Sequence, residues 1–414
     1  MAFRRWNGGA TAVAQVKTIR FTTSAASDVV TITMTGEDGS TQAVTHTVAD
    51  TNNNTTAAAV QAACSSSSLS LFQQVTFTVS TDTVTVTADL AGRPFTLAVT
   101  DDGSTAYTVA DPTANAGPND WNTAANWSGS AVPIDEDLVN FTDGAFDVLY
   151  GLDQSAIQLR QMTVASGYRG NIGTNTAALR IDTDPGSGSG AETLDLAGSG
   201  YYYNFEGAFP IVNVTKNNGT LKIKGTIGKT SFVGSAVAGT ITLDSSSATT
   251  NGNAITVTQV SPACLIRIPS TATNTGAIVQ DSGKIELSAV TKADKSPLLL
   301  AGSAKFTTKD SGQVSGAGSG TLGEIRVLSG LYSHESDANF GGSSPNLVLY
   351  GGRVDMTKAR ASTGAEFVDL GVVEVYGGDL DLSAAGNIAS VTTLTKYGGV
   401  VLQSASTLSV SKFT

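Results

Sequence analysis

The side chains of this chain that could do acid–base or metal chemistry are a few carboxylates near its C-terminus. Asp355 and Asp381 occupy the same place in two copies of a repeated phrase, and Glu374 lies in the second copy. If the copies stack as neighbouring strands, the two aspartates lie about 5 Å apart. That separation suits the carboxyl pair of a retaining glycoside hydrolase, and the oxygens could also hold a hard cation. The alternative is two solvated aspartates on an outer face.

Other kinds of reactive site have little support in the sequence. The chain has two histidines, and His46 lies in an alternating apolar run, which favours a packed or edge position. Ser333, His334 and Asp337 follow one another within one turn, where triad geometry is rarely reached. His and Cys pairs at metal spacing are absent, and Gly186–Gly190 lacks the Lys and helix of a phosphate-binding loop. We therefore predict no catalytic residue, no metal and no cofactor.

The carboxylates belong to a repeat that must position them. Three copies read Leu347–Met356, Val373–Leu382 and Leu394–Gln403, and a looser copy, Ile325–His334, precedes them. Copies begin at 325, 347, 373 and 394, so the period is 21 to 26 residues. In the three close copies, apolar residues alternate on both sides of a Gly-Gly pair, as in strand, tight corner and strand. This pattern predicts a right-handed parallel β-helix whose coils stack on one core.

Stacking in this register makes further predictions about side chains. Arg353 should lie over Asp379, as a surface ion pair that contributes little. In the last copy, Lys396 and Gln403 take inward positions that are apolar in earlier copies, which is typical of a terminal coil facing solvent or a partner.

Tyrosines at the corners form a predicted outward column of Tyr350, Tyr376 and Tyr397. Packing of three chains side by side would cover this column, whereas the alternative is a column stacked on itself along a solvated face. A second aromatic cluster, Tyr201 to Phe205, has outward rings, with Tyr201 and Tyr203 as candidates. These rings would pack on a neighbouring subunit or stack on a sugar, and we favour packing.

The N-terminal half predicts a separate small domain. Short alternating strands surround an alanine-rich helix, Ala57–Cys64, which an Asn-rich N-cap precedes. We predict a docking arm at 1–15, a small α+β sandwich-like attachment domain at 16–110, a linker and cap at 111–145, and the β-helix at 146–414. The fold class is therefore mainly β.

Aromatic and basic residues flank this domain on both sides. Arg4, Arg5 and Trp6 form either a docking peptide or a frayed terminus. Trp121 and Trp127 lie beside the predicted domain boundary, where they suit a cap over the first coil of the solenoid. The alternative for these two rings is an aromatic platform for sugar.

Composition excludes several functional classes. The chain has 414 residues, 45 of them Gly, and a formal charge of −11, which opposes a nucleic-acid-binding surface. No run of 18 apolar residues is present, so no membrane span is predicted, and no secretory signal follows Met1. Cys64 and Cys264 lie far apart and are predicted to be buried free thiols.

Two stretches resemble known proteins. Arg5–Val16, running into the small domain with Ala91–Leu97, resembles the N-terminal part of structural proteins of tailed bacteriophages. Asp120–Trp127 and phrases such as Leu394–Gly399 are similar to β-helical repeats of phage fibres and autotransporter-type adhesins. Together they span most of the chain, and no catalytic motif of these proteins can be placed on it.

The resemblance implies a virion surface protein, assembled in the host cytoplasm, as a capsid decoration or head fibre. It would dock on the major capsid protein or on tail proteins through its N-terminal part, form a homotrimer and project a β-helix, with a host surface glycan as a candidate ligand. Two alternatives remain. One is a tail fibre or tailspike that binds or cleaves host polysaccharide, and the other is a secreted bacterial adhesin.

Overall fold

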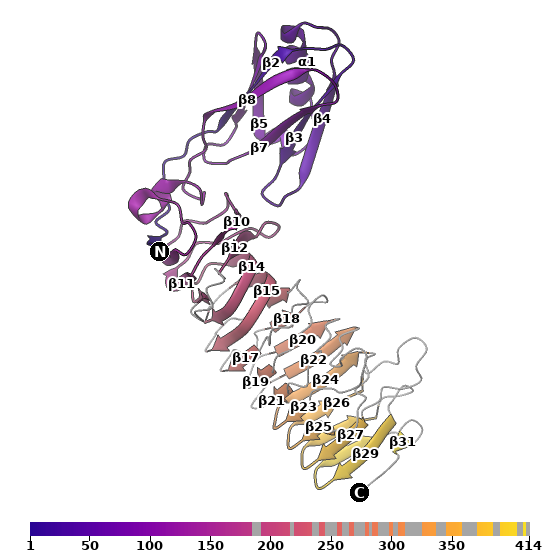
Figure 1. Cartoon of the computed structure of the whole chain (residues 1–414). Coiled ribbons are helices and arrows are strands. Elements are labelled where there is room, and N and C mark those ends of the chain that lie inside the picture. Colours follow the sequence, from indigo (N-terminus) through magenta and orange to yellow (C-terminus); the bar gives the residue numbers. More distant parts are fainter. Residues whose placement is uncertain are drawn as a thin grey trace.

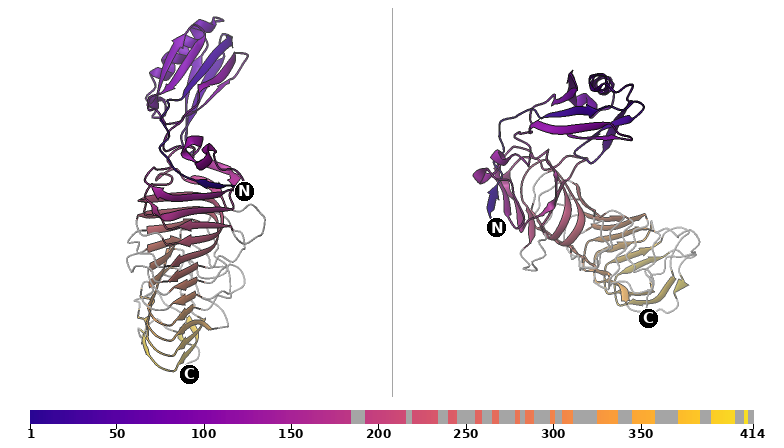
Figure 2. Two further views of the ribbon diagram at one scale, coloured as in Figure 1. Left: turned by 90° about the vertical axis from the view of Figure 1, so that its left-hand side faces the viewer. Right: turned by 45° about the horizontal axis from the view of Figure 1, so that its top comes forward.

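The computed structural model shows a small domain joined to a long β-solenoid (Figure 1). The residues it describes are 1–183, 192–215, 219–233, 240–244, 255–258, 265–268, 278–280, 284–288, 298–300, 305–310, 325–336, 345–357, 371–383, 390–403 and 409–410. The small domain lies at one end of the elongated solenoid, and the C-terminus lies at the other (Figures 1 and 2). The N-terminus lies at the junction between the two parts rather than at the tip of the small domain.

The small domain is a sandwich of two antiparallel sheets, ordered β5-β6-β2-β8 and β4-β3-β7. The strands are β2 (Val16–Thr23), β3 (Val29–Thr35), β4 (Thr41–Thr47), β5 (Val75–Ser80), β6 (Thr83–Ala88), β7 (Thr96–Asp101) and β8 (Ala106–Thr113). The last strand, β8, extends to Thr113 and so carries the domain past its predicted end at residue 110.

The predicted helix is present as α1 (Asn53–Ser65), and a 3-10 turn, η1 (Phe72–Gln74), follows it. Asn52 caps the helix, because its side chain accepts hydrogen bonds from the backbone N–H groups of Asn54 and Thr55. Helix and strands share one apolar core that includes Cys64, a buried free thiol whose pKa burial raises to about 12. The prediction for Cys64 is therefore confirmed, whereas Cys264 lies outside the described residues.

Beyond the sandwich, parallel strands form a solenoid with two ladders. One ladder runs through β9 (Leu138–Gly144), β11 (Gln161–Tyr168), β13 (Thr193–Leu196), β14 (Tyr202–Val214), β15 (Thr220–Val233), β17 (Ile255–Thr258), β19 (Ile278–Gln280), β21 (Leu298–Leu300), β23 (Ile325–Val327), β25 (Pro345–Leu349), β27 (Gly371–Val375), β29 (Ser390–Lys396) and β31 (Ser409–Val410). The predicted mainly β fold with a parallel solenoid is confirmed.

The second ladder also contains the long strands β14 and β15. Its other members are β10 (Asp153–Gln158), β12 (Leu179–Asp182), β16 (Thr240–Asp244), β18 (Leu265–Ile268), β20 (Lys284–Ser288), β22 (Lys305–Asp310), β24 (Leu331–Ser336), β26 (Arg353–Asp355), β28 (Asp379–Leu382) and β30 (Val400–Gln403). Buried apolar side chains between the ladders form one continuous core along the solenoid.

The repeated phrases stack in the predicted register. Ile325 pairs with Leu347, Leu347 with Val373, and Val373 with Leu394, which are the first residues of the four copies. The second glycine of each Gly-Gly corner has a positive φ, as at Gly378 with +78°. A Cβ at Gly378 would lie 2.5 Å from the Gly352 carbonyl oxygen, so the corner tolerates no side chain there.

The first coil is completed by the N-terminus of the chain. The strand β1 (Phe3–Arg5) pairs in parallel with β9, and Trp6 continues the pairing with a 2.9 Å bond from its N–H to the Asn140 carbonyl. The ring of Trp6 is buried against Trp127 and Phe141. The sandwich is thus inserted between the first strand of the solenoid and the rest of it.

The expectation of a free docking arm at residues 1–15 is therefore wrong for its first part. Besides the buried Trp6, Arg4 forms an ion pair of 3.1 Å with Asp137, whose side chain is 1 % exposed. Arg5 remains exposed on β1 and donates to the side chain of Asn7. Strand pairing and burial hold this segment on the solenoid and leave Arg5 as its outward basic group.

Replacement of Trp6 by Ala should destabilise the first coils. The variant Trp6→Ala removes a buried ring between two others, and such truncations cost about 3–5 kcal/mol. We expect a lower midpoint of thermal unfolding and faster proteolysis around residues 138–168. The matched control is Phe3→Ala on the same strand, where the side chain is 58 % exposed. Equal midpoints for the two variants would contradict the closing role of Trp6.

Candidate functional site

The carboxylates of the C-terminal coils share one guanidinium. Asp355 and Asp381 are register partners on β26 and β28, as predicted. Arg353 donates to Asp381 at 2.9 Å and lies 3.5 Å from Asp355. The register also pairs Arg353 with Asp379, but the ion pairs of Arg353 go to the other two aspartates. The predicted ion pair with Asp379 is thus replaced by a three-residue cluster.

Each of these two aspartates also closes a turn. Asp355 accepts from the N–H and the hydroxyl of Thr357 at 2.9 and 2.6 Å. Asp381 accepts in the same way from Ser383 at 3.1 and 2.5 Å. Asp381 is nearly buried, with 8 % of its side chain exposed, so the expectation of two solvated aspartates is wrong for this residue.

This arrangement of carboxylates suits the stacking of neighbouring coils better than catalysis. A general acid and a nucleophile need one carboxyl with a raised pKa and one that faces the substrate. Here both carboxylates are tied to the same Arg353 and to the hydroxyl two residues onward. Glu374 is likewise engaged, since it accepts from the Tyr376 hydroxyl at 3.2 Å. Arg353 bridges carboxylates of neighbouring coils and thereby supports their register.

The tyrosine column forms as predicted. The ring centroids of Tyr350 and Tyr376 are 5.0 Å apart, those of Tyr376 and Tyr397 are 4.6 Å apart, and the planes differ by 12° and 13°. Lost hydration and the charge of Glu374 raise the pKa of Tyr376. Stacked rings this close present edges and leave no room for a sugar between them. The rings thus stack on one another along an exposed face, with Tyr397 the most exposed at 65 %.

The two interface candidates of the upstream aromatic cluster, Tyr201 and Tyr203, differ in exposure. Tyr201 lies just before β14 and is 71 % exposed, whereas Tyr203 is fully buried in the solenoid core. Burial raises the pKa of Tyr203, and its hydroxyl accepts from the Gly200 N–H at 3.2 Å. The prediction of Tyr203 as an interface residue is therefore wrong, because its side chain faces the core. Alternation along the strand does not extend to Tyr201, which precedes it.

The tryptophan pair lies in the core of the first coil. Trp121 and Trp127 are 0 % and 1 % exposed, with ring centroids 4.6 Å apart, and both contact Phe141. The indole N–H of Trp127 donates to the Trp121 carbonyl at 2.7 Å. The 3-10 turns η2 (Ala124–Asn126) and η3 (Ser128–Ser130) carry this segment over the coil. The position matches the capping interpretation, and buried rings offer no sugar platform.

The remaining reactive side chains form no site in the part of the chain that the structure describes. Within it, no group of three or more His, Cys, Asp or Glu side chains is placed to hold a metal ion. His46 lies on β4 with its Nε2 atom buried. The side chain of His334 and the whole of Asp337 lie outside the described residues. No described helix has the length and apolar character that crossing a bilayer requires.

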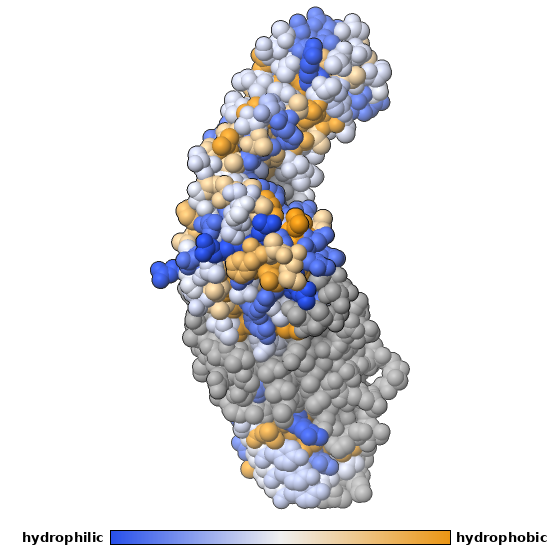
Figure 3. Space-filling model, turned by 60° about the vertical axis from the view of Figure 1, so that its left-hand side comes forward, coloured by the Kyte–Doolittle hydropathy of each residue, from blue (hydrophilic) through white to orange (hydrophobic). Residues whose placement is uncertain are grey.

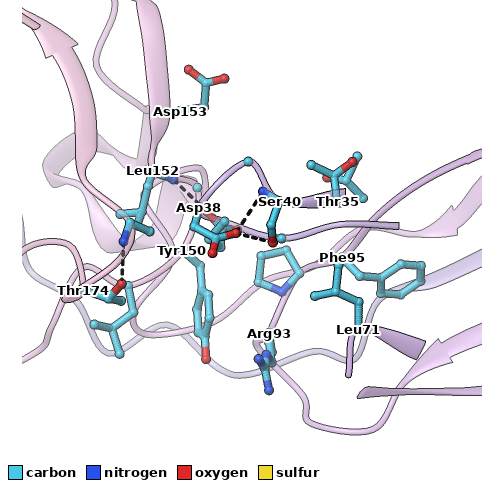
Figure 4. A pocket seen from close by; sticks show the side chains of 18 of the residues that line it. Thr35, Asp38, Ser40, Leu71, Arg93, Phe95, Tyr150, Leu152, Asp153 and Thr174 are labelled. Atoms are coloured by element: carbon cyan, nitrogen blue, oxygen red, sulfur yellow. Dashed lines mark hydrogen bonds between the residues drawn. The ribbon is translucent and has the colours of Figure 1, made fainter. Parts of the chain in front are cut away.

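A cleft between the sandwich and the first coils was not predicted. It has a volume of about 790 Å³. One wall is the β3–β4 turn, residues 36–40, together with residues 93–96 (Figure 4). The other wall consists of residues 149–153 with Asp120, Asn122, Thr174, Thr176, Ala177 and Arg180. The cleft exists only because the sandwich leans on the solenoid, so neither segment alone predicts it.

Two features hold the cleft walls together. Glu37, at the tip of the β3–β4 turn, accepts a hydrogen bond from the Leu152 N–H at 3.3 Å. On the other side, the strands leading into and out of the sandwich meet, with a 2.7 Å bond from the Val13 N–H to the Ala116 carbonyl. There Gly117 contacts Gly92 so closely that a Cβ at Gly117 would lie 2.6 Å from the Gly92 Cα. The joint is therefore supported at both edges.

Three carboxylates lie close together where the β3–β4 turn meets the solenoid. Burial is the main cause that raises the pKa of Glu37, and the charges of Asp120 and Asp153 add to it. Burial also raises the pKa of Asp120, against the lowering effect of its bonds to Asn122 and Asn115. Asp153 is paired with Arg180 at 2.5 Å.

Comparison with known proteins adds no relative. No family model matches the sequence, and no curated protein matches it. The function must therefore be argued from the fold and from the surfaces described above.

Truncation of Asp381 should loosen the C-terminal coils. Asp381→Ala removes the acceptor for Arg353 and for Ser383, and an interaction of this kind is worth about 1–3 kcal/mol. We expect faster proteolysis within residues 345–403. Asp379→Ala, an exposed position on the same strand, is the control and should behave as wild type. Loss of stability in both variants alike would argue against the shared cluster.

Neighbouring carboxylates of the β3–β4 turn should respond to pH with opposite signs. Because the pKa of Glu37 is raised in the folded protein, its protonated form adds to the free energy of unfolding below pH 4.5. This stabilising contribution is lost as the pH rises through the raised pKa. At pH 7, Glu37→Gln should therefore melt above wild type, and the difference should vanish at low pH.

Asp38 is the matched control for this experiment. The Ser40 hydroxyl and N–H lower its pKa from 3.8, so its contribution is present above 3.8 and is lost as pH falls through the lowered value. Asp38→Asn should then melt below wild type at pH 7. Calorimetric scans from pH 3 to pH 8 test both signs, and a Glu37→Gln variant that melts lower at pH 7 would contradict the burial argument.

Proposed function

We propose that the protein is a structural protein of a tailed-phage particle surface, attached through the sandwich and projecting the solenoid. The observation that supports this proposal most is the layout of the chain. A separate domain is inserted into the first coil of an elongated solenoid and lies at one end of it (Figures 1 and 2). A rod with an attachment domain at one end suits a head fibre or decoration, and the sequence resemblance supports the same class.

The sandwich offers an uncharged surface for attachment. On the outer face of the sheet β4-β3-β7, cross-strand rows contain threonine and alanine, as in Thr45, Thr31 and Thr100. The side chains at the two edges of this face are exposed: Thr41, Ala43, Thr45, Thr47, Thr96, Ala98 and Thr100. Depletion of charge is typical of the centre of protein interfaces. This face is our proposed contact with the particle, in place of the N-terminal arm.

The solenoid end supplies the projecting surface. Its tyrosine column is exposed along the last coils, as are the outward Val400 and Leu402 of β30. Packing of these edges against neighbouring copies, as in a homotrimer, is part of the proposal. On the face seen in Figure 3, hydrophobic residues also gather where the solenoid begins, near the sandwich. Exposed apolar side chains at that end include Phe3, Ile134 and Phe146.

Mass spectrometry of purified particles tests the proposal. We expect the protein in the particles, with a copy number that separates a capsid decoration from a tail fibre when compared with the major capsid protein. Absence from particles, with the protein found only in the culture fluid, would contradict the proposal and leave the secreted adhesin.

Variants of the sandwich then test its attachment face. The double variant Thr45→Glu and Thr100→Glu places charge on both sides of Thr31 and should lower the copy number per particle several-fold. The control is Thr78→Glu with Ser80→Glu, two exposed residues on β5 in the other sheet. Equal incorporation of both variants would reject this face while leaving the virion role intact.

A further inference from the structure

The cleft between the sandwich and the first coils has the volume and the mixed lining of a ligand site. At about 790 Å³ it falls in the usual range for small-molecule pockets. Its two walls come from separately folded parts, and such junctions are common places for ligand sites. Of the attachment face proposed above, Thr96 alone also lines the cleft, and the tyrosine column does not line it.

Aromatic and aliphatic side chains supply the apolar part of the lining. Tyr150 of the solenoid and Phe95 of the sandwich both line the cleft and are half-buried. In Figure 4 the ring of Phe95 lies beside Leu71 and points away from Tyr150. Phe95 also packs against the sandwich core, which fixes its position. Unlike the stacked column of Tyr350, Tyr376 and Tyr397, these two rings are not paired with another ring among the described contacts. The flat C–H face of a sugar can therefore lie on the ring of Tyr150.

Groups that both donate and accept hydrogen bonds surround these rings. Hydroxyls come from Thr35, Ser70, Thr96 and Thr176, and Asn122 adds a side-chain amide. The half-buried Arg93 also lines the cleft, and its guanidinium has no ion pair within the described part of the chain. Sugar hydroxyls donate and accept at once, so they match a lining of this kind.

The charges of the cleft argue against an ionic ligand. Its acidic side chains are Glu37, Asp38, Asp120 and Asp153, against Arg93 and Arg180. The acidic excess opposes phosphates and other anions.

A basic peptide fits less well than a neutral ligand, because the carboxylates are already engaged. Asp153 is bound to Arg180, Asp38 to Ser40, and Asp120 to Asn115 and Asn122. Glu37 accepts from the Leu152 N–H. A cation would also meet the charge of Arg93, which lines the same cleft. What the cleft leaves to a ligand is aromatic surface and hydrogen-bonding groups, because its carboxylates already have partners.

We propose that this cleft binds an uncharged oligosaccharide, with Tyr150 as the stacking surface, Phe95 as part of the apolar lining and Arg93 as a hydrogen-bond donor. The ligand would touch both the sandwich and the first coils, so its binding would also fix the angle between them. This site does not depend on the protein being a virion component.

Saturation-transfer NMR on the full chain tests the proposal. The probes are maltotetraose, cellotetraose, chitotetraose and mannotetraose, each at millimolar concentration. We expect transfer to at least one of them, and about tenfold weaker binding after Tyr150→Ala, since a lost aromatic contact has this order of effect. Tyr397→Ala, on the exposed column at the other end of the solenoid, should bind as wild type.

A second variant, Arg93→Ala, and a basic peptide probe, tetralysine, show whether the cleft binds an oligosaccharide. Arg93→Ala should also weaken binding, and its circular dichroism shows whether the fold is kept. Absence of transfer to all four probes, or transfer unchanged in both Tyr150→Ala and Arg93→Ala, would overturn the proposal. Binding of tetralysine without binding of any oligosaccharide would overturn it in favour of a basic peptide. Mass spectrometry of particles is a separate readout, so failure of this site and failure of the virion role are distinguishable.

Discussion

Parallel coils hold one another through hydrogen bonds between strands, and the outermost coil of such a stack has no partner for its outer edge. In this protein the first coil obtains its partner from β1, more than a hundred residues earlier in the chain. Trp6 then fills the end of the core beside Trp121 and Trp127. This closure decides where everything else lies, because a sandwich inserted after Trp6 must start and finish at the closed end of the solenoid.

Insertion at this point explains both the shape of the molecule and its cleft. Two chain segments lead into and out of the sandwich, and they pair through Val13 and Ala116 rather than running as free linkers. The β3–β4 turn contacts the solenoid on the opposite side through Glu37. A domain held at two edges leaves a gap between them that neither part possesses alone. The proposed sugar site thus lies in this joint, whereas the proposed attachment face is the outer face of the sheet β4-β3-β7.

The sequence was informative where local pattern repeats and silent where distant segments meet. Alternating apolar residues around Gly-Gly corners predicted the register of Leu347, Val373 and Leu394, because a residue at each corner must be glycine and the strands have a two-residue period. Three residues of β1 carry no such period, so their pairing with β9 left no signal in the sequence.

Side-chain environments were predicted less well than register, for similar reasons. Tyr203 faces the core because it shares the buried face of β14 with Phe205 and pairs with the buried Leu221. Asp381 is nearly buried because Arg353 and Ser383 bind it, which parity along a strand does not show.

The measurement that tests the central claim most directly is electron microscopy of particles bearing gold labels on the C-terminus or on the sandwich. The account predicts the C-terminal label farther from the particle surface than the sandwich label, and the reverse order would contradict it.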